Sequence, residues 1–286
     1  MSNNIILGVD IGGSHISSAL VNIKNGKILD GTSFRKKIDA HAKTAEIISV
    51  WCEVIEKSLN TAEHSGEIGI AMPGPFDYGN GISYMKGMGK YDALYGLDVG
   101  QLLLKELGSK VKSLRFVNDA GCFLQGELSH GLAAPYSSVM GFTIGTGFGS
   151  ARGISGLAKD ANYWCHPFMG GICEDLFSSK WFVAKYNQYA GKTTTNVKEL
   201  IENADCGNPL LQVFDEFSMN MGVFLTQIYK KENFDCVVLG GNISKASALF
   251  LPQLKYYLNT MSISSTVYIS AKGEDAALIG AACSVG

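Results

Sequence analysis

The chain has 286 residues, of which 46% are hydrophobic and 17% are charged, and its formal net charge is -2. This balance is typical of a globular protein and excludes an intrinsically disordered chain. The near-neutral charge offers no basic footprint for nucleic acid, so we expect no nucleic-acid partner. A chain of this length suits two domains better than one compact core.

The apolar stretches are too short to span a bilayer, so the sequence predicts no membrane partner. The N-terminus leads directly into a strand-like segment, without the basic start and apolar run of a signal peptide, and we therefore expect a cytoplasmic protein. An odd number of scattered cysteines fits a reducing compartment and no disulfide framework. These cysteines are Cys52, Cys122, Cys165, Cys173, Cys206, Cys236 and Cys283.

Apolar periodicity predicts an alternation of strands and helices along the chain. Segments with a strand pattern are 5–9, 16–23, 28–34, 67–72, 114–117, 138–144, 150–154, 234–239 and 266–270. Helical spacing is found over 44–62, in a segment from the candidate N-cap Asp98 to Leu107 with Gly108 following, in a helix-rich stretch over 174–229, and over 275–283. The first three strands, joined by glycine-containing turns, predict a meander.

One pattern, a strand followed by a glycine turn and another strand, opens at Gly8 and again at Gly141. Two similar α/β halves would create a cleft between them. We place the boundary near Asn118, which gives an N-terminal domain over 1–118 and a C-terminal domain over 119–286. The last helix, about 275–286, is a candidate to pack on the N-terminal domain.

The first glycine turn, Asp10-Ile11-Gly12-Gly13-Ser14, follows the first predicted strand. Glycines let backbone N–H groups approach an anion closely and form a concave nest. The adjacent carboxylate would repel phosphate unless Mg²⁺, which prefers oxygen ligands, lies between them. A plain hairpin turn is an equally good reading of this motif alone.

Two further glycine turns occur in the second half of the chain. Gly145-Thr146-Gly147-Phe148-Gly149 could cradle phosphates, although a bulged hairpin explains it as well, and it lacks the lysine of a Walker A loop. Gly240-Gly241-Asn242 would let a flat base lie against the backbone at a strand end, although a simple turn between strand and helix is the better reading of this motif alone.

Together and in this order, these turns and the segment Val117-Asn118-Asp119-Ala120 resemble the bacterial ROK sugar kinases, which belong to the sugar kinase, Hsp70 and actin superfamily. The Pro73-Gly74-Pro75 turn and the closing segment 274–282 are also similar to ROK features, so that the resemblance covers nearly the whole chain. It implies an α/β, two-domain actin-like ATPase (ribonuclease H-like) fold with the active site in the interdomain cleft. The implied activity is ATP-dependent phosphorylation of a hexose or N-acetylhexosamine, as in a glucokinase.

The resemblance also implies roles for individual residues. Asp119 matches the catalytic base, for which the alternative is an N-cap of a helix beginning at Ala120; Asn118 matches a residue that bonds sugar hydroxyls, and Asp10 matches the residue that holds Mg²⁺ through water. The residues implied in binding ATP and its phosphates are Asp10, Gly12, Gly13, Ser14, Gly145, Thr146, Gly147, Gly240, Gly241 and Asn242.

The sugar-recognition region departs from the family pattern of Glu-x-Gly-His, a cysteine-rich zinc motif and Gly-Cys-Leu-Glu. Asp160 stands where the first Glu is expected, Tyr163 where the His is expected, and Glu174 matches the last Glu. Polar groups aimed at particular hydroxyls discriminate strongly between sugars. The preferred sugar could therefore be an N-acetylhexosamine, fructose or another hexose in place of glucose.

A structural zinc site needs four Cys or His ligands, whereas this region offers Cys165, His166 and Cys173 without a Cys-x-Cys pair. We therefore expect ATP and Mg²⁺ but no structural zinc. The ROK resemblance also suggests a homodimer.

Two other functions remain open. The changed sugar motif would suit a non-catalytic sugar sensor, which would however have no need for the base Asp119. An ATPase of the same superfamily that phosphorylates no sugar would need a peptide-binding domain or cluster-binding cysteines. A ROK repressor would carry a helix-turn-helix ahead of the kinase-like part, and because the phosphate motif begins at residue 10 we do not expect a repressor.

Overall fold

The computed structural model describes residues 4–191, 193–203 and 208–285, so that Cys206 lies outside the described residues. The chain divides into two compact units. Unit 1 is Met1–Ala134, Gly156–Lys159 and Glu274–Gly286, and unit 2 is Pro135–Ser155 and Asp160–Gly273. The predicted boundary near residue 118 lies inside unit 1, because helix α3 (Asp119–His130) packs against other elements of that unit.

Unit 1 contains a sheet with strand order β3-β2-β1-β5-β8, in which β4 also pairs with β2. Its strands are β1 (Ile5–Ile11), β2 (His15–Asn22), β3 (Lys27–Ile28), β4 (Phe34–Lys37), β5 (Glu67–Met72) and β8 (Ser113–Asn118). β1 runs antiparallel to β2 and parallel to β5, and β5 runs parallel to β8. The carboxyl ends of β1, β5 and β8 therefore lie at the same edge of the sheet.

The predicted meander is confirmed, but its third strand is wrong in extent. The segment expected as one strand over 28–34 is divided into β3 and β4, because a turn at Gly31, with a φ of +73°, interrupts it. A separate short hairpin, β6 (Phe76–Asp77) and β7 (Ile82–Ser83), follows the Pro73-Gly74-Pro75 turn.

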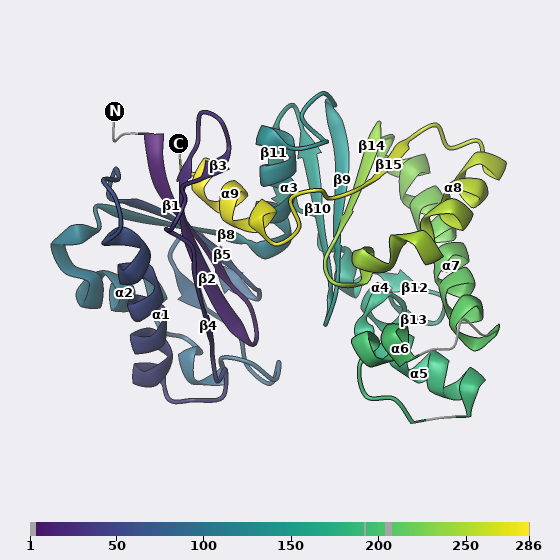
Figure 1. The fold of residues 1–286 in the computed structure, drawn as a ribbon, viewed down its shortest axis with the longest axis horizontal. Helices are drawn as coiled ribbons and strands as arrows, with labels where there is room; N and C mark the ends of the chain where they lie inside the picture. Colours follow the sequence, from purple (N-terminus) through teal and green to yellow (C-terminus); the bar gives the residue numbers. More distant parts are fainter. Residues whose placement is uncertain (1–3, 192, 204–207, 286) are drawn as a thin grey trace. The chain divides into compact units, whose positions relative to one another are not determined.

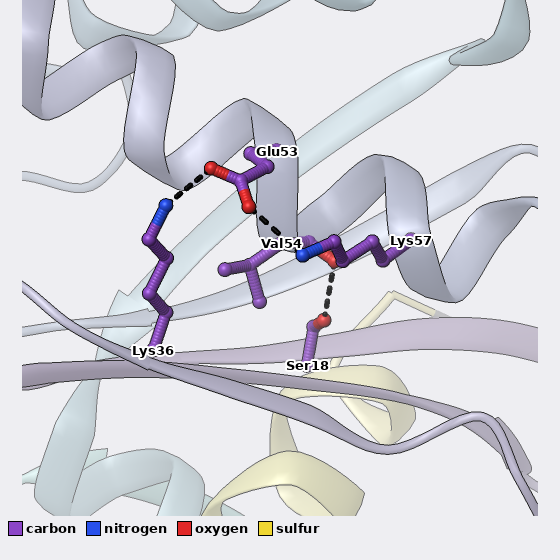
Figure 2. Close-up of polar contacts among 5 residues, drawn as sticks. All are labelled: Ser18, Lys36, Glu53, Val54 and Lys57. Carbon is purple, nitrogen blue, oxygen red and sulfur yellow. Dashed lines mark hydrogen bonds and ion pairs between the residues drawn. The ribbon is translucent and has the colours of Figure 1, made fainter.

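Helices cover both faces of this sheet (Figure 1). Helix α1 (Thr44–Leu59) packs on one face together with α2 (Val99–Leu107), whose predicted N-cap is confirmed by a 2.9 Å bond from the Gln101 N–H to the Asp98 carboxylate. Figure 2 shows how α1 is attached: the buried hydroxyl of Ser18 on β2 donates to the carbonyl oxygen of Val54 at 3.0 Å. In the same view Glu53 bonds to both Lys36 and Lys57, and these bonds hold the pKa of Glu53 down at about 2.

The opposite face is covered by α3 and α9 (Asp275–Cys283). Glycines allow unusually close packing there. A β-carbon added to Gly8 or Gly69 would lie 2.0 Å or 1.9 Å from a carbonyl oxygen of α9, and one added to Gly126 of α3 would lie 2.1 Å from another. The closing helix of the chain is therefore part of the core that supports β1, β5 and α3.

Unit 2 repeats the connectivity of unit 1, with sheet order β11-β10-β9-β14-β15. The strands of this sheet are β9 (Ser138–Ile144), β10 (Phe148–Ile154), β11 (Leu157–Asp160), β14 (Cys236–Gly240) and β15 (Thr266–Ile269), of which β11 falls mostly in the segment Gly156–Lys159 that is counted with unit 1. β9 runs antiparallel to β10 and parallel to β14, and β14 runs parallel to β15. The repeated strand pattern in the sequence is thus confirmed as a repeated sheet topology.

The core of unit 2 is aromatic, with Phe142 stacked on Phe148 at 5.4 Å and both in edge contact with Phe224. Its helices are α4 (Cys173–Phe177), α5 (Ser179–Ala190), α6 (Val197–Asn203), α7 (Asn208–Glu232) and α8 (Leu251–Thr260), and a short hairpin pairs β12 (Pro167–Phe168) with β13 (Gly171–Ile172). No helix among the described residues has the length and apolar character needed to cross a membrane.

Candidate active site

Two acidic side chains come together in unit 1 where β1 and β8 end. Asp10 lies in β1 on the same face as Gly8, the face covered by α3 and α9, and Asp119 is the first residue of α3. Burial, and to a smaller extent the charges of Asp119 and Glu274, raise the pKa of Asp10 to about 7, while Arg35 opposes this shift. The structure therefore places the predicted base and the predicted metal residue in one electrostatic site.

This donor set fits a hydrated divalent cation. A partly buried carboxylate whose ionised form is disfavoured by burial and by neighbouring carboxylates would be stabilised by positive charge. Mg²⁺ is commonly bound through one or two carboxylates and several waters. Asp10 would hold such an ion, with Asp119 close enough to share its field.

The raised pKa of Asp10 makes the metal-free protein less stable as the pH rises. Between about pH 3.8, the ordinary pKa of an aspartate, and about pH 7, Asp10 keeps its proton in the folded protein and releases it on unfolding. The free energy of unfolding therefore falls as the pH rises across this interval. The free energy of unfolding falls by at most roughly 4 kcal/mol, because one pKa unit corresponds to about 1.4 kcal/mol. At a pH above about 8, Asp10→Asn should therefore unfold at a higher midpoint temperature than the unaltered protein. Its midpoint temperature should also depend less on pH.

Thermal unfolding at several pH values in the presence of a chelator measures these midpoint temperatures. Glu63→Gln, at an exposed position, is the charge-matched control. Added Mg²⁺ should stabilise the unaltered protein more than Asp10→Asn. An Asp10→Asn midpoint that follows the same pH slope as the control would contradict the assigned environment of Asp10.

Asn118 is held by contacts on both sides of its amide. Its side-chain oxygen accepts from the Gly121 N–H at 3.1 Å, and its NH₂ group donates to the Tyr78 hydroxyl at 3.2 Å. The N-cap of α3 is therefore Asn118, which corrects the alternative that assigned this cap to Asp119. Asp119 instead accepts from the Ala120 N–H at 2.8 Å. Tyr78, which the sequence analysis missed, gave no local signal because it reaches Asn118 from a distant segment.

The first glycine turn joins two antiparallel strands, so the hairpin reading of its geometry is correct and is compatible with anion binding. The Gly12 N–H donates to the His15 carbonyl oxygen at 2.9 Å, while Gly13 and Ser14 are exposed. The hydroxyl of Tyr91 donates to the Gly12 carbonyl oxygen at 2.5 Å. This anchor from a remote loop is the second contact that the sequence analysis missed.

The two glycine turns of unit 2 lie side by side. β9 and β14 are parallel neighbours, with Gly240 paired to Thr143, so both strands lead into their turns at one edge of the sheet. Gly241 has a φ of +85°, and a β-carbon there would lie 2.4 Å from the Ile144 carbonyl oxygen. Only glycine fits this approach. The arrangement brings exposed Thr146 and Asn242 to neighbouring turns.

Glu174, at the start of α4, contacts the turn that contains Gly145–Gly147. Its carboxylate accepts from the Phe148 N–H at 3.0 Å, and a β-carbon on Gly147 would lie 2.6 Å from the same oxygen. Asp160 is exposed and accepts from the Asn162 N–H at 2.8 Å. A predicted sugar contact and a predicted phosphate turn are therefore direct neighbours in unit 2.

Tyr163 has an internal partner that the sequence did not suggest. Its hydroxyl bonds to the carboxylate of Glu232, which also forms an ion pair with Arg152. The Tyr163 ring packs edge-on against Phe224 at 5.5 Å. The structure gives Tyr163 a bonding role inside unit 2, and the sugar contact predicted for it stays a prediction.

Tyr163→Phe separates these two roles. Loss of an internal hydrogen bond to a charged carboxylate should cost about 1.5–3 kcal/mol of stability and leave the KM for sugar unchanged. Thermal unfolding and sugar titration measure both quantities. A raised KM for sugar with unchanged stability would instead restore the predicted sugar contact.

The three residues considered as zinc ligands, Cys165, His166 and Cys173, do not form a metal cluster. Across the described part of the chain, no group of three or more His, Cys, Asp or Glu side chains is arranged to hold a metal ion. No disulfide is formed by the six cysteines that the structure describes.

Comparison with known proteins gives consistent results. The model of the ROK family matches residues 6–285. The chain is 25% identical to the N-acetylgalactosamine kinase AgaK of Shewanella sp. (strain ANA-3), covering 86% of this chain and 85% of the relative. It is 23% identical to the glucokinase of Thermotoga maritima, covering 97% and 96% of the two chains.

Among solved structures, the ROK family glucokinase from Streptomyces griseus in complex with glucose and AMPPNP aligns with a TM-score of 0.81. Sequence identity is 20%, and the alignment covers 97% of this chain and 98% of that one. This likeness confirms the predicted actin-like ATPase fold.

Proposed function

This chain belongs to the ROK family, and on that premise we propose that it is an ATP-dependent kinase that phosphorylates a hydroxyl of a hexose or N-acetylhexosamine. The observation that carries the proposal is the pairing of Asp10 with Asp119 where β1 and β8 end. One carboxylate at this edge can serve as a base while the other organises a cation. Curated relatives named as kinases of N-acetylgalactosamine and glucose support the substrate class.

In this proposal Asp119 accepts the proton of the attacking sugar hydroxyl as its oxygen bonds to the γ-phosphorus and the bond to the leaving ADP oxygen breaks. Asn118 orients that sugar through its amide, which Tyr78 and the Gly121 N–H hold in place. Mg²⁺, bound at Asp10 through water, would neutralise charge on the phosphates. The Gly12–Ser14 turn presents its backbone to the same phosphates.

Unit 2 carries further candidate contacts for the nucleotide and the sugar. The neighbouring turns at Gly145–Gly147 and Gly240–Asn242 offer their exposed residues Thr146, Gly241 and Asn242 to the nucleotide. Glu174 and Asp160 offer carboxylates to sugar hydroxyls. Because Glu174 already accepts from the Phe148 N–H, it would couple the sugar site to the turn beside it. Cytoplasmic action, a homodimer and the absence of zinc remain predictions, which fractionation, sedimentation and metal analysis would measure.

ADP release with Mg-ATP across hexoses and N-acetylhexosamines tests the proposal. We expect at least one sugar to stimulate release strongly, with a KM that rises in Glu174→Gln. Thermal protection by a sugar that fails to stimulate ADP release would reject the kinase and favour the sensor.

A further inference from the structure

A remote loop lies against the first glycine turn and is firmly fixed there. Tyr91, whose hydroxyl donates to the Gly12 carbonyl oxygen, is fully buried, with its ring edge-on to Trp51 at 5.3 Å. Its backbone has a φ of 58°, and its N–H donates to the Ala40 carbonyl oxygen at 2.8 Å. These contacts fix the backbone from which the side chain of the preceding residue, Lys90, extends.

Lys90 extends beside the turn. A β-carbon placed on Gly13 would lie 3.8 Å from the Cδ atom of Lys90, its nearest neighbour. Lys90 is partly buried, yet among the described residues its ammonium group has neither an ion pair nor a hydrogen bond. A lysine with no partner among the described residues, beside the exposed Gly13, is suited to an anionic ligand.

A second lysine, Lys37, lies in the strand β4 that pairs with the residue following the turn. The Ile38 N–H donates to the Ser14 carbonyl oxygen at 2.9 Å, and Lys37 lies opposite His15 in the pairing of β4 with β2. Lys37 is exposed and has no ion pair among the described residues, whereas its neighbour Lys36 is bonded to Glu53 (Figure 2).

We propose that Lys90 binds the phosphate chain of the phosphoryl donor, with Lys37 adding positive charge at the same turn. This inference rests on the proposed function, which requires a donor at the turn. The ligand class is a linear phosphate chain, carried by a nucleotide or free. Lys90 would supply the charge that a Walker A lysine supplies elsewhere, which matters because Asp10 places negative charge beside the phosphates.

Calorimetric titration of Lys90→Met with Mg-ATP, Mg-tripolyphosphate and adenosine tests this. The matched control is Lys86→Met, because Lys86 lies on the same loop but its ammonium group sits 4.9 Å from the centroid of the Tyr95 ring. We expect Lys90→Met to lower the affinity for Mg-ATP at least about tenfold, in a salt-dependent manner, and to leave the affinity for adenosine unchanged. Lys86→Met should bind like the unaltered protein, and Lys90→Arg should restore most of the loss.

The titrations also separate the sources of the phosphate chain. Weakening of Mg-ATP alone supports a nucleotide-borne chain, and weakening of tripolyphosphate as well supports recognition of the chain itself. Equal affinity of Lys90→Met and the unaltered protein for both ligands, or no binding of either to the unaltered protein, overturns the proposal. If no sugar is phosphorylated while tripolyphosphate binding still depends on Lys90, the kinase assignment fails and this site stands.

Discussion

Asp119→Asn is expected to lower the kcat of sugar phosphorylation by about two to four orders of magnitude, the usual contribution of a positioned general base. Asparagine keeps an oxygen that can accept from the Ala120 N–H, so the start of α3 should remain intact. It cannot take the proton of the sugar hydroxyl. Asp119→Asn therefore removes the proposed proton acceptor with little change in shape.

Affinity for the sugar should stay within roughly threefold, because the lost interaction belongs to the transition state. Initial-rate kinetics and equilibrium sugar binding give the two quantities independently. A kcat within about tenfold of normal would remove Asp119 from the role of base.

Gly280→Ala is expected to destabilise unit 1 strongly. The added β-carbon would lie 1.8 Å from the Cys122 carbonyl oxygen and 2.6 Å from the Gly126 N atom, both in the backbone of α3. Overpacking of this kind costs about 3 kcal/mol, and more where backbone must move. Alanine recovers up to about 1 kcal/mol of helix propensity, so the steric term prevails.

The resulting fall in the unfolding midpoint should be roughly 4–8 °C for a chain of this size. Gly79→Ala is the control, because its β-carbon would meet nothing closer than 3.5 Å. If calorimetry shows Gly280→Ala unfolding at or above the temperature of the control, the packing of α9 on α3 is not as described.

The strands and turns that carry the phosphate motifs could be predicted because their signals are local. Alternating apolar residues locate β5 over Glu67–Met72, and Asp98 with Gly108 marks both ends of α2. The relation between the halves was visible as a repeated strand and glycine pattern, which each sheet realises with the same connectivity.

The supporting contacts could not be predicted because they join distant segments. In the sequence, Tyr78 and Tyr91 have no feature that distinguishes them from other loop tyrosines. Only the structure shows that their hydroxyls form hydrogen bonds with Asn118 and Gly12. From the sequence alone, Gly280 is a residue of low helix propensity inside a predicted helix. The close approach of the α3 backbone is what requires a glycine there. The bond of Tyr163 to Glu232 likewise depends on the fold of unit 2 and has no local signal in the sequence.

The most direct test of the kinase assignment follows the phosphorus atom itself. The protein is incubated with the sugar panel and ATP labelled in its γ-phosphate, and the products are separated and identified by mass spectrometry. We predict label in a sugar phosphate, formed in step with ADP by the unaltered protein and nearly absent with Asp119→Asn. Label found only in inorganic phosphate, or equal sugar labelling by both proteins, would contradict the account.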